Sequence, residues 1–395
     1  MNILIINVGS SSIKYQLLAM PNENIICEGM AERIGNEKAN LRYKSKQVDI
    51  SKIENIPNHK VGLQKIAQLI LDPEKGVIKN TNEIYAVAHR VVHGGNSFSK
   101  TTLINDSVKQ KIKELAVLAP LHNPVNLVGI ELSEKMFPEA KQIAIFDTAF
   151  HQTIPQIAKQ YAIPNKLYTE NDIQVYGFHG TSHKYVSEKT VQFLKQNKSR
   201  LITIHLGNGC SITAIKNGKS IDHSMGFAPS NGLIMGSRSG DIDHALIFYL
   251  VNNLGYQLSE VKEMLDKKSG MYGLTGYSDL RDIQNEAEKG NTQCILALEM
   301  NAYRIKKYIG AYTAAMNGLD AIVFTAGIGE NSSLIRKLVC SEMEYLGIVI
   351  DMEKNESKSS KIRQIHSAQS KVKILVTPTN EELEIAKQAY GLLTS

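Results

Sequence analysis

The first residues of the chain alternate apolar runs with a turn of small residues. Ile3–Ile6 is a run of branched and aliphatic side chains, and Ile13–Leu18 resumes an extended pattern after the turn Gly9–Ser12. Branched apolar residues favour strands, whereas glycine and serine favour turns. The pattern therefore predicts a β-hairpin at the start of the chain.

Strand patterns then alternate with helical ones. Further β-type runs occur at Ile25–Ile34, Ala86–Val92 and Ile143–Phe146. Apolar residues at helical spacing predict a helix over Val61–Leu71 and a second helix from Asn123, with Asn123 as its N-cap and Pro124 in its first turn. Alternating strands and helices indicate an α/β fold.

The second half of the chain repeats the opening pattern. A helix that Thr181 or Ser182 would cap, running to about residue 196, precedes the strand Leu201–His205 and another glycine turn, Gly207–Gly209. The strands expected at 211–215 and 219–221 flank Asn217-Gly218, a preferred pair for two-residue hairpins. Two halves that open alike indicate an ancient duplication, although no tandem repeat of fixed period is present.

The last hundred residues predict a long helix followed by two more strands. The elements expected are a helix over Thr292–Met316, a strand over Ala321–Thr325, a loop over Ala326–Asn331, a solvated segment over Glu353–Lys361, a strand over Ile374–Val376 and a turn at Pro378. Thr379 would open the last helix, with Glu382 completing a capping box. Glu381 is then either a first-turn acid that complements the helix dipole or an oxygen ligand for Mg²⁺, and spacing alone does not separate the two.

Length and composition indicate a compact protein with more than one core. A chain of 395 residues exceeds the roughly 250–300 residues that one hydrophobic core serves, so two domains are expected. The net charge of +6 is dispersed, and no Trp is present, which does not favour a nucleic-acid surface; a mildly basic cleft for small anions fits better.

The spacing of the cysteines and the lengths of the apolar runs indicate the cellular compartment of the protein. The four cysteines, Cys27, Cys210, Cys294 and Cys340, show no paired spacing, which favours a reducing compartment. The chain has no run of 18 consecutive apolar residues, and its start lacks a basic region ahead of an apolar one. We expect a cytoplasmic protein without a membrane partner.

Three glycine turns are candidates for phosphate binding, because such turns expose backbone N–H groups. They are Gly9–Ser12, Gly207–Gly209 and Gly327–Gly329, and each follows a β-type run. One turn alone is weak evidence, but three together favour a nucleotide site. A Walker loop is rejected: Gly218-Lys219-Ser220 matches its second half, but Thr213 stands where its first glycine is required. A dinucleotide fingerprint is also absent.

Two arginines and two histidine pairs are the remaining chemical signals. Arg90 and Arg238 each lie beside glycines, and a guanidinium can bind carboxylate or phosphate through two parallel hydrogen bonds. A reaction that joins a carboxylate to a phosphoryl group would suit them, and a surface ion pair is the alternative. His89/His93 and His179/His183 have the spacing of metal ligands, but no neighbouring acid or cysteine supports zinc, so structural or phosphate-contacting roles are favoured.

Nine motifs, in order and spanning nearly the whole chain, closely resemble the acetate kinase (acetokinase) family. They are NVGSSSIKY (7–15), HRVVHGG (89–95), APLHNP (119–124), FDTAFHQT (146–153), YGFHGTSH (176–183), HLGNG (205–209), MGSRSGDID (235–243), FTAGIGENS (324–332) and PTNEEL (378–383). The resemblance implies two duplicated actin-like, sugar-kinase-like (ribonuclease H-like) α/β domains with ATP in the cleft between them. The domains expected are 1–150, with the helix 379–395 packed back on it, and a nucleotide-binding domain over 151–378.

The resemblance also implies roles for individual residues. Catalytic residues would be Arg90, Asp147, His179 and Arg238, and acetate would contact Arg90, Val92, Leu121, His122, Phe178 and Pro229. ATP would contact Ser10, Ser12, Lys14, His205, Leu206, Gly207, Asn208, Gly209, Asp279, Leu280, Arg281, Gly327, Ile328, Gly329, Glu330 and Asn331. Asn7 and Glu381 would hold Mg²⁺, with Mn²⁺ as a substitute. The family's usual homodimer is expected too.

Asp147 is the proposed acid or base of that family. Carboxylic acids titrate near about 4, so acetate is already ionised at neutral pH and needs no base. We therefore interpret Asp147 as a group that positions substrate and orients Mg²⁺. Two other functions remain open: a propionate or short-chain fatty acid kinase, and an actin-like or chaperone-like ATP-driven binding module.

Overall fold

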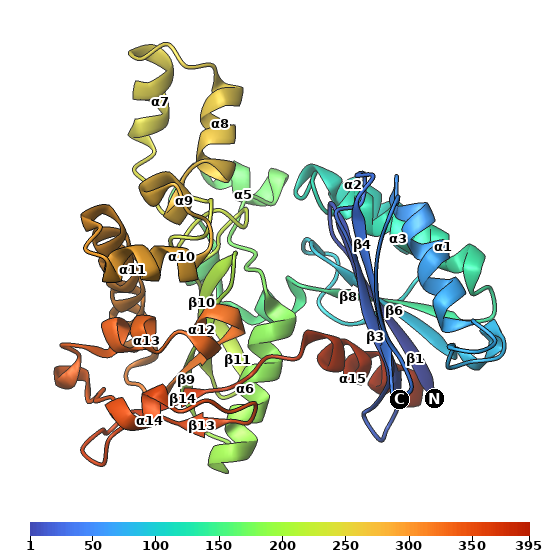
Figure 1. Ribbon diagram of the computed structural model, residues 1–395. Coiled ribbons are helices and arrows are strands. Elements are labelled where there is room, and N and C mark those ends of the chain that lie inside the picture. Colours follow the sequence, from blue (N-terminus) through green and yellow to red (C-terminus); the bar gives the residue numbers. More distant parts are fainter. The chain divides into compact units, whose positions relative to one another are not determined.

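The computed structural model describes residues 1–395 and divides into two compact units. Unit 1 comprises Met1–Ala149 and Asn380–Ser395, and unit 2 comprises Phe150–Thr379. Each unit is built on one mixed β-sheet with helices packed against it (Figure 1). None of the helices combines the length and the apolar character that a membrane span requires.

The sheet of unit 1 has eight strands in the order β5-β4-β3-β2-β1-β6-β8-β7. Their bounds are β1 Asn2–Val8, β2 Ser12–Ala19, β3 Asn24–Glu32, β4 Ala39–Ser45, β5 Asp49–Glu54, β6 Ala86–Val91, β7 Thr102–Leu103 and β8 Lys141–Phe146. The predicted hairpin is confirmed, because β1 and β2 pair antiparallel from Asn2–Ala19 to Val8–Ile13. Strands β1, β6 and β8 are parallel, so their carboxyl ends lie at one edge.

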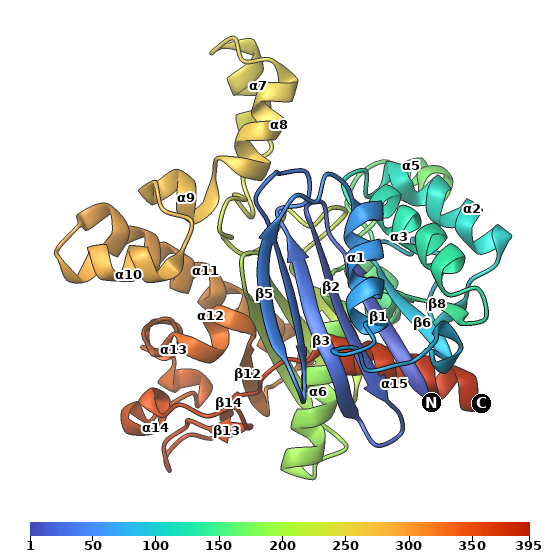
Figure 2. The ribbon, with the colours of Figure 1, turned by 45° about the vertical axis from the view of Figure 1, so that its right-hand side comes forward.

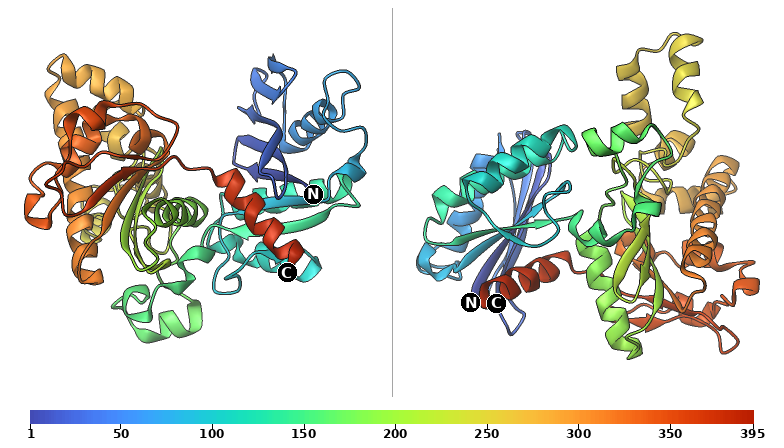
Figure 3. Two further views of the ribbon diagram at one scale, coloured as in Figure 1. Left: turned by 90° about the horizontal axis from the view of Figure 1, so that it is seen from below. Right: turned by 180° about the vertical axis from the view of Figure 1, so that it is seen from behind.

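Helices cover both faces of this sheet. They are α1 His59–Ile70, α2 Asp106–Glu114, α3 Asn123–Met136 and α15 Glu381–Thr394, with 3₁₀ turns at Thr81–Glu83 and Leu115–Val117. Leu4 and Ile6 of β1 pack in one core with Leu63 of α1. Helix α15 packs against β1, β2, β6 and β8, and Figures 2 and 3 show it on the face opposite α1.

Two predicted helix starts in unit 1 are wrong. Asn123 is the first residue of α3 and not its cap; its side chain instead accepts a hydrogen bond from the His93 N–H (3.1 Å) and donates to the His93 carbonyl (3.0 Å). Helix α15 is capped by Asn380, whose Oδ1 accepts from Leu383 N at 3.0 Å. The expected capping box from Thr379 does not form, because Glu382 forms an ion pair with Lys14 at 2.7 Å.

Unit 2 has a six-stranded sheet in the order β11-β10-β9-β12-β14-β13. Its strands are β9 Arg200–Leu206, β10 Cys210–Lys216, β11 Lys219–His223, β12 Ala321–Thr325, β13 Arg363–Gln364 and β14 Lys373–Val376. Asn217 and Gly218 join β10 to β11 with φ values of 52° and 77°, the conformation that this residue pair was expected to supply.

The central strands of the two sheets follow one plan. In unit 1, β3-β2-β1 are antiparallel neighbours and β6 and β8 continue parallel to β1; in unit 2, β11-β10-β9 are followed in the same way by β12 and β14. The duplication that the sequence indicated is therefore confirmed in the topology.

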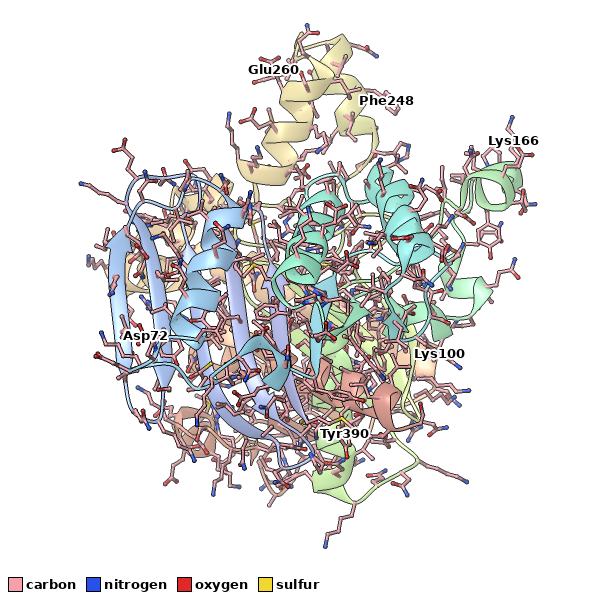
Figure 4. The ribbon with its side chains drawn as sticks, turned by 90° about the vertical axis from the view of Figure 1, so that its right-hand side faces the viewer. Asp72, Lys100, Lys166, Phe248, Glu260 and Tyr390 are labelled. Carbon is pink, nitrogen blue, oxygen red and sulfur yellow. The ribbon has the colours of Figure 1, made fainter.

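The helices of unit 2 are more numerous than those of unit 1. They are α4 Gln156–Lys159, α5 Asn165–Asn171, α6 Gly180–Leu194, α7 Ala245–Asn252, α8 Leu258–Lys267, α9 Gly270–Thr275, α10 Leu280–Glu288, α11 Thr292–Met316, α12 Ala326–Asn331, α13 Ser333–Cys340 and α14 Met352–Glu356, with 3₁₀ turns at Ala149–Thr153 and Glu344–Leu346. Helix α6 packs on β9 and β12, and α11 packs on β9 and β10. Helices α7 and α8 form a hairpin that projects from the unit, with Phe248 on its surface (Figure 4).

Two local predictions in unit 2 are also wrong. Residues 326–331 form the short helix α12 and not a loop, because the Arg336 guanidinium donates to the Gly329 and Glu330 carbonyls and so satisfies the end of that helix. Helix α6 starts at Gly180, one or two residues before the predicted caps. The hydroxyl of Ser182 is engaged with His205 Nδ1 at 2.8 Å.

Candidate active-site surfaces

The first candidate surface lies at the carboxyl edge of the unit 1 sheet. Asn7 lies near the end of β1, Arg90 near the end of β6, and Asp147 directly after β8. The start of α15 adds Glu381, and β2 adds Lys14. Carboxyl ends of parallel strands are where ligands bind in many α/β proteins. Residues far apart in the sequence thus form one charged cluster.

Arg90 is the centre of this cluster. Its Nη2 forms an ion pair with Asp147 Oδ2, its Nη1 donates to Asn7 Oδ1 at 3.4 Å, and its Nε lies 3.9 Å from Glu381 Oε2. Burial alone would lower the pKa of Arg90, but Asp147 and Glu381 raise it above its usual value. The guanidinium is therefore held charged in a fixed orientation.

The acidic groups of the cluster fit a hard cation. Burial raises the pKa of Glu381 to about 7, and the nearby Asp147 and Glu382 add to the shift. A positive ion beside Glu381 would relieve this repulsion. No group of three or more His, Cys, Asp or Glu side chains is arranged to hold a metal ion. Mg²⁺ needs few protein ligands, since it keeps waters and binds phosphate oxygens, so the oxygens of Asn7 and Glu381 suit it.

The remaining predicted residues of unit 1 differ in their exposure to solvent. Ser10 is exposed and Ser12 half-buried in a turn closed by the bond from Gly9 N to the Ser12 carbonyl (2.8 Å). Val92 is buried, whereas Leu121 is exposed and His122 is half-buried. Sequence reasoning missed Asn126, whose amide accepts from Val92 N (3.1 Å) and donates to the Val8 carbonyl (2.9 Å). A buried asparagine within a helical pattern was the available signal.

The second candidate surface is a pocket of about 550 Å³ inside unit 2. Nine of its lining residues were predicted to bind ATP: Leu206, Gly207, Asn208, Asp279, Leu280, Arg281, Gly327, Ile328 and Asn331. His205, Gly209, Gly329 and Glu330 were predicted too but do not line it. Ser278, Gln284, Asn301 and Ser332 line it without having been predicted. All four are polar residues, and their spacing in the sequence follows no recognisable motif.

Local structure explains the shape of this pocket. Asp279 caps α10 by accepting from Arg281 N at 2.9 Å, and its hydrogen bonds with the Arg281 side chain lower its pKa to about 2. Gly327 has open space where a side chain would stand. A flat ligand can therefore approach the start of α12 closely.

His179 and Arg238 converge beside this pocket. A Cβ atom placed on Gly209 would lie 3.3 Å from His179 Nε2 and 3.4 Å from Arg238 Nη2. Arg238 also donates to the Pro229 carbonyl, and burial lowers its pKa. Because Gly209 has no side chain, these two nitrogen atoms lie close to the backbone between pocket residues Asn208 and Cys210. This arrangement suits an anion.

Buried histidines occur in both units. Burial lowers the pKa of His89 and of His93 to about 4, so both are neutral at pH 7. His89 Nε2 lies 2.8 Å from the Gln142 side-chain oxygen. In unit 2, the predicted substrate residue Phe178 is buried, and its carbonyl lies 2.9 Å from His151 Nε2.

Comparison with known proteins identifies the family. A model of the acetokinase family matches residues 2–387. The chain belongs to the acetokinase family. It is 63% identical to an acetate kinase of Flavobacterium johnsoniae over 393 residues, covering 100% of both chains.

Solved structures of the acetokinase family have the same fold. The chain matches an acetate kinase of Porphyromonas gingivalis with a TM-score of 0.93 and 43% identity, covering 99% of each chain. It matches a propionate kinase of Francisella tularensis with a TM-score of 0.92 and 43% identity, covering 98% of each chain. The predicted fold, two duplicated domains of the actin-like and sugar-kinase-like type, is confirmed.

Proposed function

We propose that this protein is an acetate kinase, which transfers the γ-phosphoryl group of ATP to the carboxylate of acetate and catalyses the reverse reaction. Membership of the acetokinase family supports a kinase with a carboxyl acceptor. The single geometric observation that carries the proposal is the convergence of His179 Nε2 and Arg238 Nη2 at Gly209, beside the pocket of unit 2.

Unit 2 would bind the nucleotide. The adenosine would lie in the pocket between α10 and α12, against Asp279–Arg281 and Gly327–Asn331. The phosphates would follow the turn His205–Gly209, where backbone N–H groups and glycines allow close approach. Arg238 and His179 would then donate to the oxygens of the γ-phosphoryl group, where charge must be stabilised during transfer. Lys14, Ser10 and Ser12 of unit 1 would contribute further phosphate contacts.

Unit 1 would bind acetate. The guanidinium of Arg90 is held by Asp147 and Asn7, and its planar set of donors suits a carboxylate. Val92, the exposed Leu121 and His122, the N-cap of α3, would contact the substrate. Phe178 and Pro229 keep their proposed part in selecting a small acyl chain. Since each unit would contribute residues to the binding of both substrates, each turnover would need both units.

No general base is required in this scheme. Acetate is ionised at neutral pH, so Asp147 would act by orienting Arg90 rather than by removing a proton. Asn7 and Glu381 would hold Mg²⁺, which, when bound, neutralises developing charge on the phosphate oxygens. Mn²⁺ is proposed as a substitute ion. In-line placement of the two substrates would supply much of the rate.

The acyl preference is the main alternative within the same chemistry. One relative of known structure is a propionate kinase at 43% identity. One methylene group is worth only about 1–3 kcal/mol of discrimination, so overlap is expected. An actin-like binding module is not favoured, because the chain's relatives at 63% and 43% identity are acetate kinases.

Hydroxylamine trapping tests the proposal directly. Wild-type protein with ATP, Mg²⁺ and either acetate, propionate or butyrate should form the acyl hydroxamate fastest with acetate. Faster turnover of propionate would make the protein a propionate kinase. Absence of any hydroxamate, together with ATP hydrolysis stimulated by a protein partner, would favour a binding module.

A homodimer and a cytoplasmic location belong to the same proposal. The α7–α8 hairpin exposes Leu246, Phe248 and Tyr249, an apolar surface that a second copy of the chain could cover. The four cysteines are buried free thiols, in keeping with a reducing compartment. Light scattering of wild-type protein and of Phe248→Glu tests the first point: the wild type should have twice the mass of one chain, and the variant less.

A further inference from the structure

A chain of buried hydroxyl and imidazole groups runs inward from His179 in unit 2. The Ser211 hydroxyl lies 2.9 Å from His179 Nδ1 and 2.7 Å from His183 Nε2. The other ring nitrogen of His183, Nδ1, lies 2.7 Å from the Thr203 hydroxyl. Ser211, His183 and Thr203 are each 0% exposed. The three residues, called the relay below, come from β10, α6 and β9.

We propose that the relay holds His179 in the neutral tautomer with its proton on Nε2, so that His179 is a permanent hydrogen-bond donor at Gly209. The inference deepens the proposed function, on which its catalytic meaning rests. Ser211, His183 and Thr203 are then positioning residues, because they act through His179 and touch no substrate.

The surroundings of His183 determine its charge. Burial, and then the neighbouring His151 and His205 rings, hold the pKa of His183 well below its usual value. The ring is therefore neutral at pH 7 and carries one N–H. Both ring nitrogens nevertheless lie within hydrogen-bond distance of a hydroxyl. One nitrogen must donate and the other must accept.

The Thr203 hydroxyl decides which nitrogen donates. This hydroxyl lies within hydrogen-bond distance of His183 Nδ1. If Nδ1 donated to Thr203, the threonine proton would be buried without an acceptor, an arrangement that folded proteins avoid. If Thr203 donates to Nδ1 instead, every proton of the relay has an acceptor. His183 then carries its proton on Nε2 and donates to Ser211.

The Ser211 hydroxyl in turn determines which ring nitrogen of His179 carries the proton. Since Ser211 accepts from His183, its own proton is available for His179 Nδ1. A ring that accepts at Nδ1 carries its proton on Nε2 when neutral. His179 Nε2 is the atom that lies 3.3 Å from the Cβ position of Gly209, with Arg238 Nη2 at 3.4 Å. The relay thus aims an N–H donor at the proposed phosphoryl position.

The groups that face His179 also favour its neutral form. The cationic Arg238 flanks the same space at Gly209, and the His205 ring stacks on His179 with centroids 4.3 Å apart. Ser182 lies 2.8 Å from His205 Nδ1. A second positive charge on His179 would be repelled by Arg238. Arg238 then supplies the charge for the anion, and His179 supplies a directed hydrogen bond without first taking up a proton.

Histidine tautomers can be read by nuclear magnetic resonance without any activity assay. Long-range ¹H–¹⁵N spectra of full-length protein with ¹⁵N-labelled histidine distinguish the two neutral tautomers from the cation, and His179→Gln assigns the signals. At neutral pH, His179 and His183 should both be neutral and protonated on Nε2. A charged His179, or one protonated on Nδ1, would overturn the proposal.

Kinetics of matched variants supply the second arm. Ser211→Ala should lower kcat for acyl hydroxamate formation by about tenfold or more, in the range expected when a preorganised donor is weakened, with KM for acetate and for ATP changed less than about twofold. Thr203→Val should act in the same direction, and Thr203→Ser, which restores the hydroxyl, should recover the rate.

Thr190→Val is the control for simple loss of a buried hydroxyl. Thr190 is also on α6 and is buried, but its hydroxyl lies 3.4 Å from that of Thr377 and contacts no histidine. The kcat of Thr190→Val should stay at the wild-type value. Wild-type kcat in Ser211→Ala would contradict the relay. If wild-type protein forms no acyl phosphate, the proposed function fails, whereas the tautomer measurement still decides the relay.

Discussion

Arg90 forms an ion pair with Asp147, a side chain only 1% exposed, at the carboxyl edge of the unit 1 sheet. Removal of the guanidinium would leave a buried carboxylate without this partner, which typically costs about 3–5 kcal/mol. Arg90→Ala is therefore expected to lower the free energy of unfolding as well as substrate binding. Stability and kinetics must be measured on the same sample.

Asp147→Asn separates charge from shape at this pair. The amide keeps the size of the side chain but binds Arg90 less strongly, so the guanidinium loses its fixed orientation. We expect kcat/KM for acetate to fall about 100-fold, as misplacement of a substrate-positioning group can cause, and the dependence of the rate on Mg²⁺ to change. Initial rates over a Mg²⁺ series measure both.

Asp320→Asn is the matched control for that experiment. Asp320 also pairs with an arginine, Arg200, at 2.8 Å, but it lies directly before β12 in unit 2. Its replacement should affect stability and leave kcat unchanged. If Asp147→Asn kept both the wild-type rate and the wild-type Mg²⁺ dependence, the role given to Asp147 would be wrong.

Gly209→Ala tests the close approach of His179 and Arg238 to the backbone at residue 209. The added methyl group would occupy the position 3.3 Å from His179 Nε2 and 3.4 Å from Arg238 Nη2. Loss of one such donor contact typically costs about 10²–10³-fold in kcat, and we expect a decrease of this size with little change in the unfolding midpoint. Gly310→Ala is the control: it has open space within α11 and should gain about 0.5–1 kcal/mol of stability without losing activity. Equal rates for the two variants would argue against an anion at Gly209.

Gly327→Leu tests the nucleotide pocket. Nothing lies within 4 Å of the Cβ position of Gly327, so the leucine would extend into open space at the pocket. Blocking about three methylene-sized volumes there should raise KM for ATP by more than about tenfold, which corresponds to about 1.4 kcal/mol or more of lost binding. KM for acetate should stay within about twofold of wild type. An unchanged KM for ATP would place the adenosine elsewhere.

The buried histidines of unit 1 predict how stability depends on pH. Burial holds the pKa of His89 at about 4, whereas an unfolded chain titrates near about 6.5. Between these values the unfolded state binds a proton that the folded state does not, so stability falls as pH decreases, by at most about 1.4 kcal/mol per pH unit for each such histidine.

Urea unfolding at several pH values between about 7 and 4 measures that slope for wild type and for His89→Asn. The variant should show a shallower dependence because it lacks one depressed titration. His244→Asn is the control, since the His244 side chain is 89% exposed, and its slope should equal that of the wild type. An equal slope in His89→Asn would show that His89 does not contribute.

Local patterns predicted most strands and several helices. The run Ala321–Thr325 and the helix Thr292–Met316 have the predicted bounds, because each is a long or uninterrupted pattern flanked by clear turn residues. The N-cap predictions were wrong because tertiary contacts competed for the side chains. Asn123, Ser182 and Glu382 would each have served a helix end, but they bond instead to His93, His205 and Lys14.

The candidate sites, like the fold, were predicted only in part from the sequence. Glycine turns and their flanking residues are visible in the sequence, and nine predicted residues line the unit 2 pocket. The relay was not predicted as a unit, since Ser211 and Thr203 carry no motif of their own and acquire meaning only when β9 and β10 pair beside α6. Side-chain partners across a sheet depend on register, which sequence spacing does not specify.

The central claim is that Arg90 binds acetate and that Arg238 stabilises the transferring phosphoryl group. Acyl hydroxamate formation by Arg90→Ala and Arg238→Ala tests this claim most directly. We expect Arg90→Ala to raise KM for acetate by about tenfold or more while KM for ATP stays near wild type, and Arg238→Ala to lower kcat by about 100-fold or more. Wild-type rates and wild-type KM for acetate in both variants would contradict the account.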